Sequence, residues 1–139
     1  MKEKVLISAC LIGVNCKYNG GNNYDEKLFN KLSNQYDLIP VCPEIMGGLS
    51  TPRAASEIVG DKVINKDEVD VTINYFKGAK ETLEIAKKFN INKAILKAKS
   101  PSCGEGKVYD GTFSGTLTDG DGITTKMLKD NGVEVINLK

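Results

Sequence analysis

Short aliphatic runs alternate along this chain with longer stretches in which apolar residues recur every three or four positions. The first pattern is typical of buried β-strands and the second of amphipathic helices. Alternation between the two is what βαβ units produce. We therefore predict an α/β, Rossmann-like three-layer fold with a mainly parallel sheet of about four strands. The expected strands are residues 4–8, 38–41, 93–98 and 133–136, and the expected helices are residues 25–33, 68–89 and 121–131.

Local residue types set the expected ends and faces of these helices. Asp25 precedes the first helix as an N-cap, and Gly132 follows the last helix as a C-terminal stop. Residues 42–67 are too many for a plain connector, so we expect a small ribbon at 58–59 and 63–64. In the longest helix, the face expected to pack inward is formed by apolar residues at helical spacing, namely Val69, Ile73, Phe76, Leu83, Ala86 and Phe89.

The four cysteines follow these aliphatic runs. Cys10 lies just past the first predicted strand, Cys42 past the second and Cys103 in the loop after the third. Cys16 shares the loop of Cys10 with Gly13 between them, a spacing that differs from the CxxC of a zinc knuckle. Because the carboxyl ends of parallel strands open into one crevice, we expect the cysteines to meet there. The pattern indicates a metal or iron–sulfur site, against the alternative that each cysteine is a small buried hydrophobe.

Composition narrows the class of protein. The 139 residues suit one domain, and 40% hydrophobic and 27% charged residues are ordinary globular values. A formal net charge of +1 gives no field that would draw the chain to nucleic acid or a membrane. The lysines at 97, 99 and 107 are interpreted as a solvated rim. The chain starts straight into a short strand, without the apolar stretch of a signal peptide, so we expect a cytoplasmic protein with reduced cysteines.

Polar residues near Cys42 and Cys103 add acid–base groups to the same edge. Alternation along an extended backbone would point Cys42 and Glu44 the same way, so that a thiol and a carboxylate share one pocket. The KSPSCG motif brings Ser100 and Cys103 into a turn shaped by proline and glycine. Two simpler explanations stay open: Glu44 caps a turn or pairs with Arg53, and Ser100 satisfies backbone donors.

A family resemblance runs through four ordered stretches, SACLIGVNCKYNGG at 8–21, PVCPEIMGGLSTPR at 40–53, KSPSCG at 99–104 and GTLTDGDGITTKML at 115–128. Along almost its whole length the chain resembles the small thiouracil desulfidases. The resemblance implies an iron–sulfur enzyme with a [4Fe–4S] cluster held by three cysteines, whose fourth iron binds the sulfur of a thiolated uracil. It also implies that this sulfur is removed by hydrolysis and released as sulfide, without net electron transfer.

The cluster ligands expected within that resemblance are Cys10, Cys16 and Cys103. The first two share a glycine-bearing loop, and the third comes from the neighbouring strand end. Exchange of Cys42 for Cys16 as the third ligand is the main alternative. When it is not a ligand, Cys42 is expected on the substrate side of the cluster.

The remaining roles fall to polar residues. Glu44 is expected to act as the general base or to orient the attacking water, and Ser100 to hold that water or the substrate. Arg53 is the expected contact to the substrate ring or its phosphate, because its fork binds carbonyl and phosphate oxygens. Asp119 is a further candidate for a substrate contact.

The implied substrate is a small thiolated nucleobase or nucleoside, with a thiolated tRNA nucleotide as a larger alternative. Two functions of other classes stay open. One is a structural protein whose four thiolates bind zinc or a fully ligated cluster, which would need all four cysteines equally. The other is a metal-free binding module for nucleobases or RNA, which the near-neutral charge disfavours.

Overall fold

Four parallel strands form the central sheet. The computed structural model describes residues 2–138. The strand order is β2–β1–β5–β8, with bounds Glu3–Ser8 for β1, Tyr36–Val41 for β2, Lys93–Lys97 for β5 and Glu134–Leu138 for β8. The predicted α/β fold with a mainly parallel four-strand sheet is confirmed, and the predicted strand ends fall within about two residues of the observed ones.

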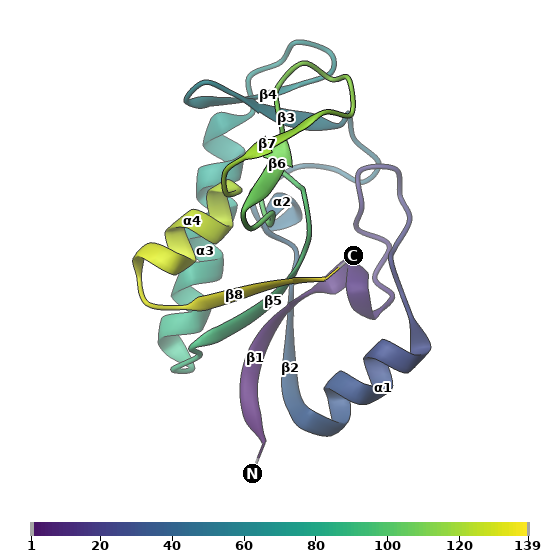
Figure 1. Ribbon diagram of the computed structural model, residues 1–139, viewed down its shortest axis with the longest axis vertical. Helices are drawn as coiled ribbons and strands as arrows, with labels where there is room; N and C mark the ends of the chain where they lie inside the picture. The colour runs from purple at the N-terminus through teal and green to yellow at the C-terminus, as the bar shows by residue number, and fades with distance from the viewer. Residues whose placement is uncertain (1, 139) are drawn as a thin grey trace.

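Helices cover both faces of this sheet (Figure 1). Helix α1 (Glu26–Gln35) packs on one face, where its Leu32 joins a buried cluster with Val5, Ile7 and Ile95. Helices α3 (Thr72–Lys88) and α4 (Ile123–Asp130) pack on the other face, where they bury Leu6, Ala94, Leu96 and Val135. Successive residues of β1 thus serve opposite cores, as expected for a strand that is covered on both sides.

The predicted helix caps are confirmed. The Asp25 side chain accepts a hydrogen bond from Leu28 N at 3.2 Å, and Gly132 follows α4 with φ of 84°. The predicted start of the longest helix was wrong, because α3 begins only at Thr72. Glu68 has a left-handed φ of 65°, and Asp70 forms an isolated β-bridge with Ile64, so this segment completes a turn and a bridge instead of a helix.

The inward face predicted for α3 was also partly wrong. Leu83 and Ala86 are buried, but Val69, Ile73, Phe76 and Phe89 are exposed, and Ile73 has 84% of its surface accessible. The buried face instead carries Tyr75, Gly78, Ala79 and Thr82 in addition to Leu83 and Ala86. Small residues along this face let α3 approach its neighbours closely. A search for large apolar residues at helical spacing therefore does not identify this face.

Two antiparallel ribbons stand above the carboxyl ends of the sheet strands (Figure 1). The first pairs β3 (Ser56–Val59) with β4 (Lys62–Asn65) and confirms the predicted ribbon. The second pairs β6 (Lys107–Tyr109) with β7 (Leu117–Asp119). A short 3₁₀ helix, η1 (Ala9–Ile12), follows β1, and the short helix α2 (Pro43–Met46) follows β2. Within residues 2–138, no helix is long and apolar enough to cross a membrane.

Helices α2 and α3 touch through their backbones at two glycines. A Cβ atom at Gly78 would lie 1.8 Å from the Pro43 carbonyl oxygen, and one at Gly47 would lie 2.0 Å from the Asn74 carbonyl oxygen. Asn74 Nδ2 also donates to the Gly47 carbonyl oxygen at 2.9 Å. A four-residue helix is not stable alone, so α3 determines where α2 and its residue Glu44 lie.

Gly78→Ala is therefore expected to lower the free energy of unfolding by roughly 1–3 kcal/mol, because the added methyl group meets a backbone carbonyl that no rotamer change can avoid. In an ordinary helix the same change would stabilise by about 0.5–1 kcal/mol. Urea denaturation followed by circular dichroism measures the difference. Lys80→Ala, at an exposed position of the same helix, is the control. A Gly78→Ala variant that is more stable than wild type would contradict the close contact.

Candidate active site

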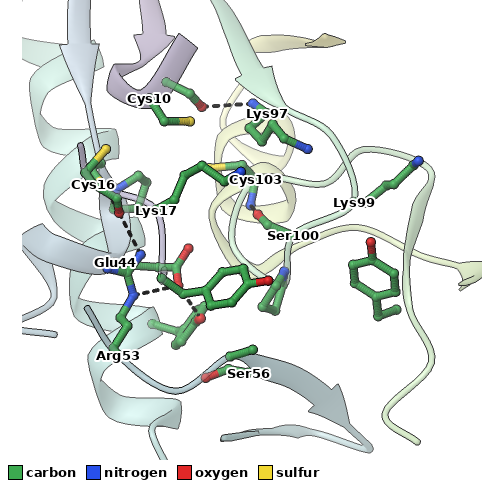
Figure 2. A pocket seen from close by; sticks show the side chains of 18 of the residues that line it. Cys10, Cys16, Lys17, Glu44, Arg53, Ser56, Lys97, Lys99, Ser100 and Cys103 are labelled. Atoms are coloured by element: carbon green, nitrogen blue, oxygen red, sulfur yellow. Dashed lines mark hydrogen bonds and ion pairs between the residues drawn. The ribbon is translucent and has the colours of Figure 1, made fainter. Parts of the chain in front are cut away.

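All four cysteines line one cavity at the carboxyl ends of the sheet strands. Cys10 lies in η1 directly after β1, Cys42 directly after β2, and Cys103 in the turn after β5. Figure 2 shows Cys10, Cys16 and Cys103 around the same space. The cavity volume of about 440 Å³ lies within the range of small-molecule pockets, roughly 300–1,000 Å³. The structure thus brings together the cysteines that the sequence pattern placed at this edge.

The chain winding reverses between β1 and β5, directly below this cavity. From β1 the chain crosses to β2 on one side, and from β5 it crosses to β8 on the other. Ser8, the last residue of β1, accepts a hydrogen bond at Oγ from Lys97 N of β5 at 2.9 Å, so the two strands end at the same level. Open α/β sheets bind ligands at such switch points.

The loop that carries Cys10 and Cys16 is held at both ends. Asn23 N donates to the Cys10 carbonyl oxygen at 2.8 Å, and Asn23 Nδ2 lies 3.6 Å from Cys10 Sγ in an N–H···S contact. Arg53 Nη2 donates to the Cys16 carbonyl oxygen at 2.9 Å. Gly13 turns the chain between them with φ of 99°, a conformation that glycine adopts without strain.

The thiols of Cys10, Cys16 and Cys42 interact as one set. Hydrogen bonding from the Cys16 thiol lowers the pKa of Cys10 to about 6 and the pKa of Cys42 to about 7. The same hydrogen bonds raise the pKa of Cys16. Burial raises the pKa of Cys103 to about 12. Hydrogen bonding within this set thus favours the thiolate at Cys10 and Cys42 and the thiol at Cys16.

A polynuclear group suits these thiols better than one metal ion. Among residues 2–138, no three cysteine, aspartate or glutamate side chains converge closely enough to hold a single ion. Structural zinc needs four ligands around one centre. An iron–sulfur cluster is held by cysteine thiolates, each on a different iron atom, and four thiols line this one cavity. The donor set therefore fits a cluster.

Glu44 is fixed beside the cysteines by two side chains from other segments. Tyr75 Oη of α3 donates to Glu44 Oε1 at 2.6 Å, and Arg53 Nε donates to the same oxygen at 3.3 Å. Tyr75 is only 1% exposed, and burial raises its pKa, so its hydroxyl remains a donor across the working pH range. The carboxylate therefore has one oxygen committed to protein donors.

Cys42 and Glu44 share the cavity as expected, but the extended backbone that was predicted to bring them together is a helix here. Cys42 is the N-cap residue of α2, and Pro43 occupies the first turn, so Glu44 projects from a helix instead of an extended chain. The expected alternative pairing of Glu44 with Arg53 is present, and it does not remove Glu44 from the cavity.

Arg53 connects three segments of the site. Besides Glu44 and the Cys16 carbonyl, its guanidinium donates to Ser50 O and Thr51 Oγ1, both at 3.1 Å. These contacts occupy four of the five N–H donors that a guanidinium has. The fork expected to bind the substrate is therefore engaged mainly by the protein, where it ties Glu44 to the Cys16 loop (Figure 2).

The turn that carries Cys103 is saturated with hydrogen bonds. Ser100 Oγ accepts from Cys103 N at 2.7 Å, so the simpler explanation for Ser100, satisfying a backbone donor, is observed. The Cys103 carbonyl oxygen accepts from Thr125 Oγ1 at 2.8 Å and from Asn137 Nδ2 at 3.0 Å. Ser100 also lines the cavity, so its hydroxyl can serve a ligand while its oxygen supports Cys103.

Asp119 lies outside the site. It belongs to β7, its side chain is 89% exposed, and it forms an ion pair with Lys107 on the neighbouring strand. The cavity-lining residues do not include it, so the structure does not bring Asp119 to the other candidate site residues. Lys107 is part of the solvated rim as predicted, whereas Lys97 and Lys99 line the cavity. Burial lowers the pKa of Lys97, although the nearby Cys10 sulfur opposes that shift.

Sequence reasoning missed several cavity residues. Tyr75 was hidden in the helical pattern, where it does not belong to the apolar face that was predicted. Ser8 was treated as the end of a strand, although its hydroxyl joins β1 to β5. Tyr109 and Phe113 reach the cavity from the β6–β7 ribbon, which carried no catalytic motif. Of these residues, only Tyr75 could have been found from the sequence. A tyrosine on a buried helix face needs a hydrogen-bond partner for its hydroxyl, and such a partner points to a nearby polar site.

Fold and cavity together define an α/β protein with a thiol-lined site at the carboxyl edge of its parallel sheet. The family model described as 2-thiouracil desulfurase matches residues 5–139, and the chain belongs to this family. The chain is 42% identical to YbbK of Bacillus subtilis (strain 168), over 96% of this chain and 94% of that protein. A solved structure titled [4Fe-4S]-dependent thiouracil desulfidase TudS matches with a TM-score of 0.92 at 36% identity, covering 98% of this chain and 91% of that chain. The resemblance found in the sequence is confirmed.

In metal-free protein, Cys42 is expected to react first with iodoacetamide at pH 7. It is the only partly exposed cysteine of the four, all of which lie within the described residues, and its pKa of about 7 leaves much of it as thiolate. Cys16 and Cys103 are both buried with raised pKa values and should react last. Peptide mass spectrometry over a time course gives the order of labelling. Cys42→Ser should remove the fast phase, and equally rapid labelling of Cys103 would show that these environments are wrong.

Proposed function

We propose that residues 1–139 form a single iron–sulfur desulfidase domain that replaces the sulfur of thiouracil-type compounds by oxygen. The supporting observation is the convergence of four thiols, the Glu44 carboxylate and the Ser100 hydroxyl in one cavity. Family membership supplies the class of substrate. In the balanced reaction, one water adds its oxygen to the thiocarbonyl carbon, the carbon–sulfur bond breaks, and sulfide leaves with the two protons of that water. No electron donor is consumed.

A [4Fe–4S] cluster held by Cys10, Cys16 and Cys103 fits the donors of this chain. Thiolates are the usual ligands of such clusters, and Lys97 and Lys17 lie near enough to Cys10 to favour its anionic form. When bound, a cluster with one iron free of protein ligands supplies a thiophilic Lewis acid for the substrate sulfur. Cys42 in place of Cys16 is the alternative ligand set. The greater exposure of Cys42 and its place next to α2 favour a substrate-side position.

Glu44 is the general base of the proposed reaction. Tyr75 and Arg53 both donate to Oε1, which leaves Oε2 as the oxygen that takes a proton from the attacking water. Ser100 accepts the Cys103 N–H at its oxygen, so its own O–H donates to that water or to the substrate ring. The carboxylate moves the proton, and the hydroxyl orients the reacting groups.

The proposed substrate is a small thiolated nucleobase or nucleoside, and a thiolated tRNA nucleotide is the larger candidate. A formal net charge of +1 gives little steering toward tRNA. Rates with 4-thiouracil, 4-thiouridine and thiolated tRNA under the same conditions separate these substrates. We place the reaction in the cytoplasm, because the four cysteines are free thiols and ligand thiols need a reducing compartment.

Anaerobic purification with cluster reconstitution tests the proposal directly. We expect about four iron atoms per chain, and loss of the thiocarbonyl absorbance of 4-thiouracil with sulfide release in the absence of a reductant. Alanine variants of Cys10, Cys16 and Cys103 should lose iron, whereas Cys42→Ala should keep iron and lose rate. Iron loss from Cys42→Ala but not from Cys16→Ala would establish the alternative ligand set. Stable zinc, or an intact cluster that needs all four cysteines and is inert toward thiouracil, would overturn the proposal.

Tyr75→Phe tests whether Tyr75 positions Glu44. We expect kcat to fall about 10-fold, which corresponds to the free energy that a hydrogen bond to a charged group contributes. KM and iron content should not change. Glu44→Gln should lower kcat roughly 10²- to 10⁴-fold, and Tyr75→Phe should add nothing in that background. Tyr36→Phe, which removes a hydroxyl at the opposite end of the sheet, is the control. Additive losses in the double variant would mean that Tyr75 does not act through Glu44.

A further inference from the structure

The cavity has a second side that the proposed chemistry does not use. Opposite the sheet, residues 110–116 connect β6 to β7, and Phe113 and Gly115 of this loop line the cavity with Tyr109 at the end of β6. Ser56 and Glu57 of β3 line the same side. The cavity therefore has a second side that both ribbons build and that includes the aromatic residues Tyr109 and Phe113.

A buried carboxylate fixes this second side. Glu57 is 8% exposed, and its Oε1 accepts hydrogen bonds from Gly111 N at 2.9 Å and Phe113 N at 3.1 Å. Gly111 has φ of 91°, and a Cβ there would lie 2.6 Å from the Ile58 carbonyl oxygen, so the loop lies directly against β3. Glu57 is the charged group that holds the β6–β7 loop to the first ribbon.

Phe113 has a backbone conformation that bulky residues avoid. Its φ is 57°, in the left-handed region, where the side chain crowds the following carbonyl. Such conformations persist where the surroundings enforce them, and they cluster at ligand sites. Here the hydrogen bond from Phe113 N to Glu57 holds this conformation against β3, and Phe113 is among the residues that line the cavity.

We infer that Phe113, held by Glu57, is the specificity-determining residue against which the flat ring of the substrate stacks. The inference rests on the proposed function, because it concerns the ring of the same thiolated nucleobase. Aromatic side chains bind nucleobases through their π-faces without reading the pattern of ring substituents. The thiol side of the cavity then handles the sulfur, while Phe113 selects aromatic rings over other thiocarbonyl compounds.

Phe113→Ala in the cluster-loaded enzyme tests the inference. We expect KM for 4-thiouracil to rise about 5- to 100-fold, the usual cost of losing one stacking ring, with kcat changed less than about twofold. Calorimetry with uracil, which has no sulfur to release, should show the same loss of affinity. Phe113→Tyr should restore both values, whereas Phe113→Leu should not. Phe89→Ala, which removes another partly exposed phenylalanine beyond α3, is the control.

Glu57 provides an independent variant that keeps the ring. Glu57→Ala removes the acceptor for both N–H groups and should raise KM and weaken uracil binding, whereas Glu57→Gln keeps an acceptor oxygen and should change them much less. Iron content should match wild type in every variant. Thermal unfolding shows whether Phe113→Ala is folded. If it is not, Phe113→Leu and Phe113→Tyr still distinguish stacking on an aromatic ring from burial of any apolar side chain.

The outcomes separate this inference from the proposed function. An active wild type whose KM and uracil affinity do not change in Phe113→Ala and Phe113→Leu would overturn the inference alone, as would a loss confined to kcat. A wild-type protein that binds uracil through Phe113 but releases no sulfide would overturn the proposed function. It would still support stacking of the ring on Phe113. Equal losses in Phe113→Tyr and Phe113→Ala would show that ring stacking is not the interaction.

Discussion

The parallel pairing of β1 with β5 is the constraint on which the rest of the structure depends. Leu6 pairs with Ala94 and Ile7 with Ile95, so the two strands end level with each other below the cavity. Residues on both faces of β1 are buried in separate cores, and a one-residue slip would place each side chain on the wrong face. Burial therefore fixes the register, and the register brings the Cys10 loop and the Cys103 turn to one level.

The groups beyond the strand ends lie on short elements that need outside support. Helices η1 and α2 have four residues each, too few for independent stability. Support comes from backbone contact of α2 with Gly78 of α3 and from the Arg53 guanidinium, which joins Glu44 to the Cys16 carbonyl. Because the thiol loop and the carboxylate share this arginine, a shift of one would displace the other. The site is therefore held as one unit even though several separate segments of chain build it.

Local periodicity predicted the strands, the shared edge of the cysteines and the Asp25 cap, because each depends on a few neighbouring residues and one topological rule. It did not predict the buried face of α3, since Gly78 carries no apolar side chain yet leaves the space that the Pro43 carbonyl of α2 occupies. The partners of Arg53 were also out of reach, because the Cys16 carbonyl is 37 residues away in sequence. Asp119 is the reverse case, in which the sequence suggested a site residue that the fold leaves outside the cavity. It lies in a stretch that resembles the family, but strand pairing exposes its side chain to solvent.

The two sides of the cavity come from different parts of the fold. The sulfur side follows from the sheet, because three of the cysteines come directly from strand ends or the turn after β5. The opposite side comes from ribbons inserted in the connections between β2 and α3 and between β5 and α4. A connection can change without disturbing strand register, because its residues lie outside the paired core. This division means that the ring a site of this kind accepts can vary while the arrangement of thiols and Glu44 stays the same. Glu57 of the first ribbon accepts hydrogen bonds from the loop of the second, so the two ribbons form this side of the cavity together.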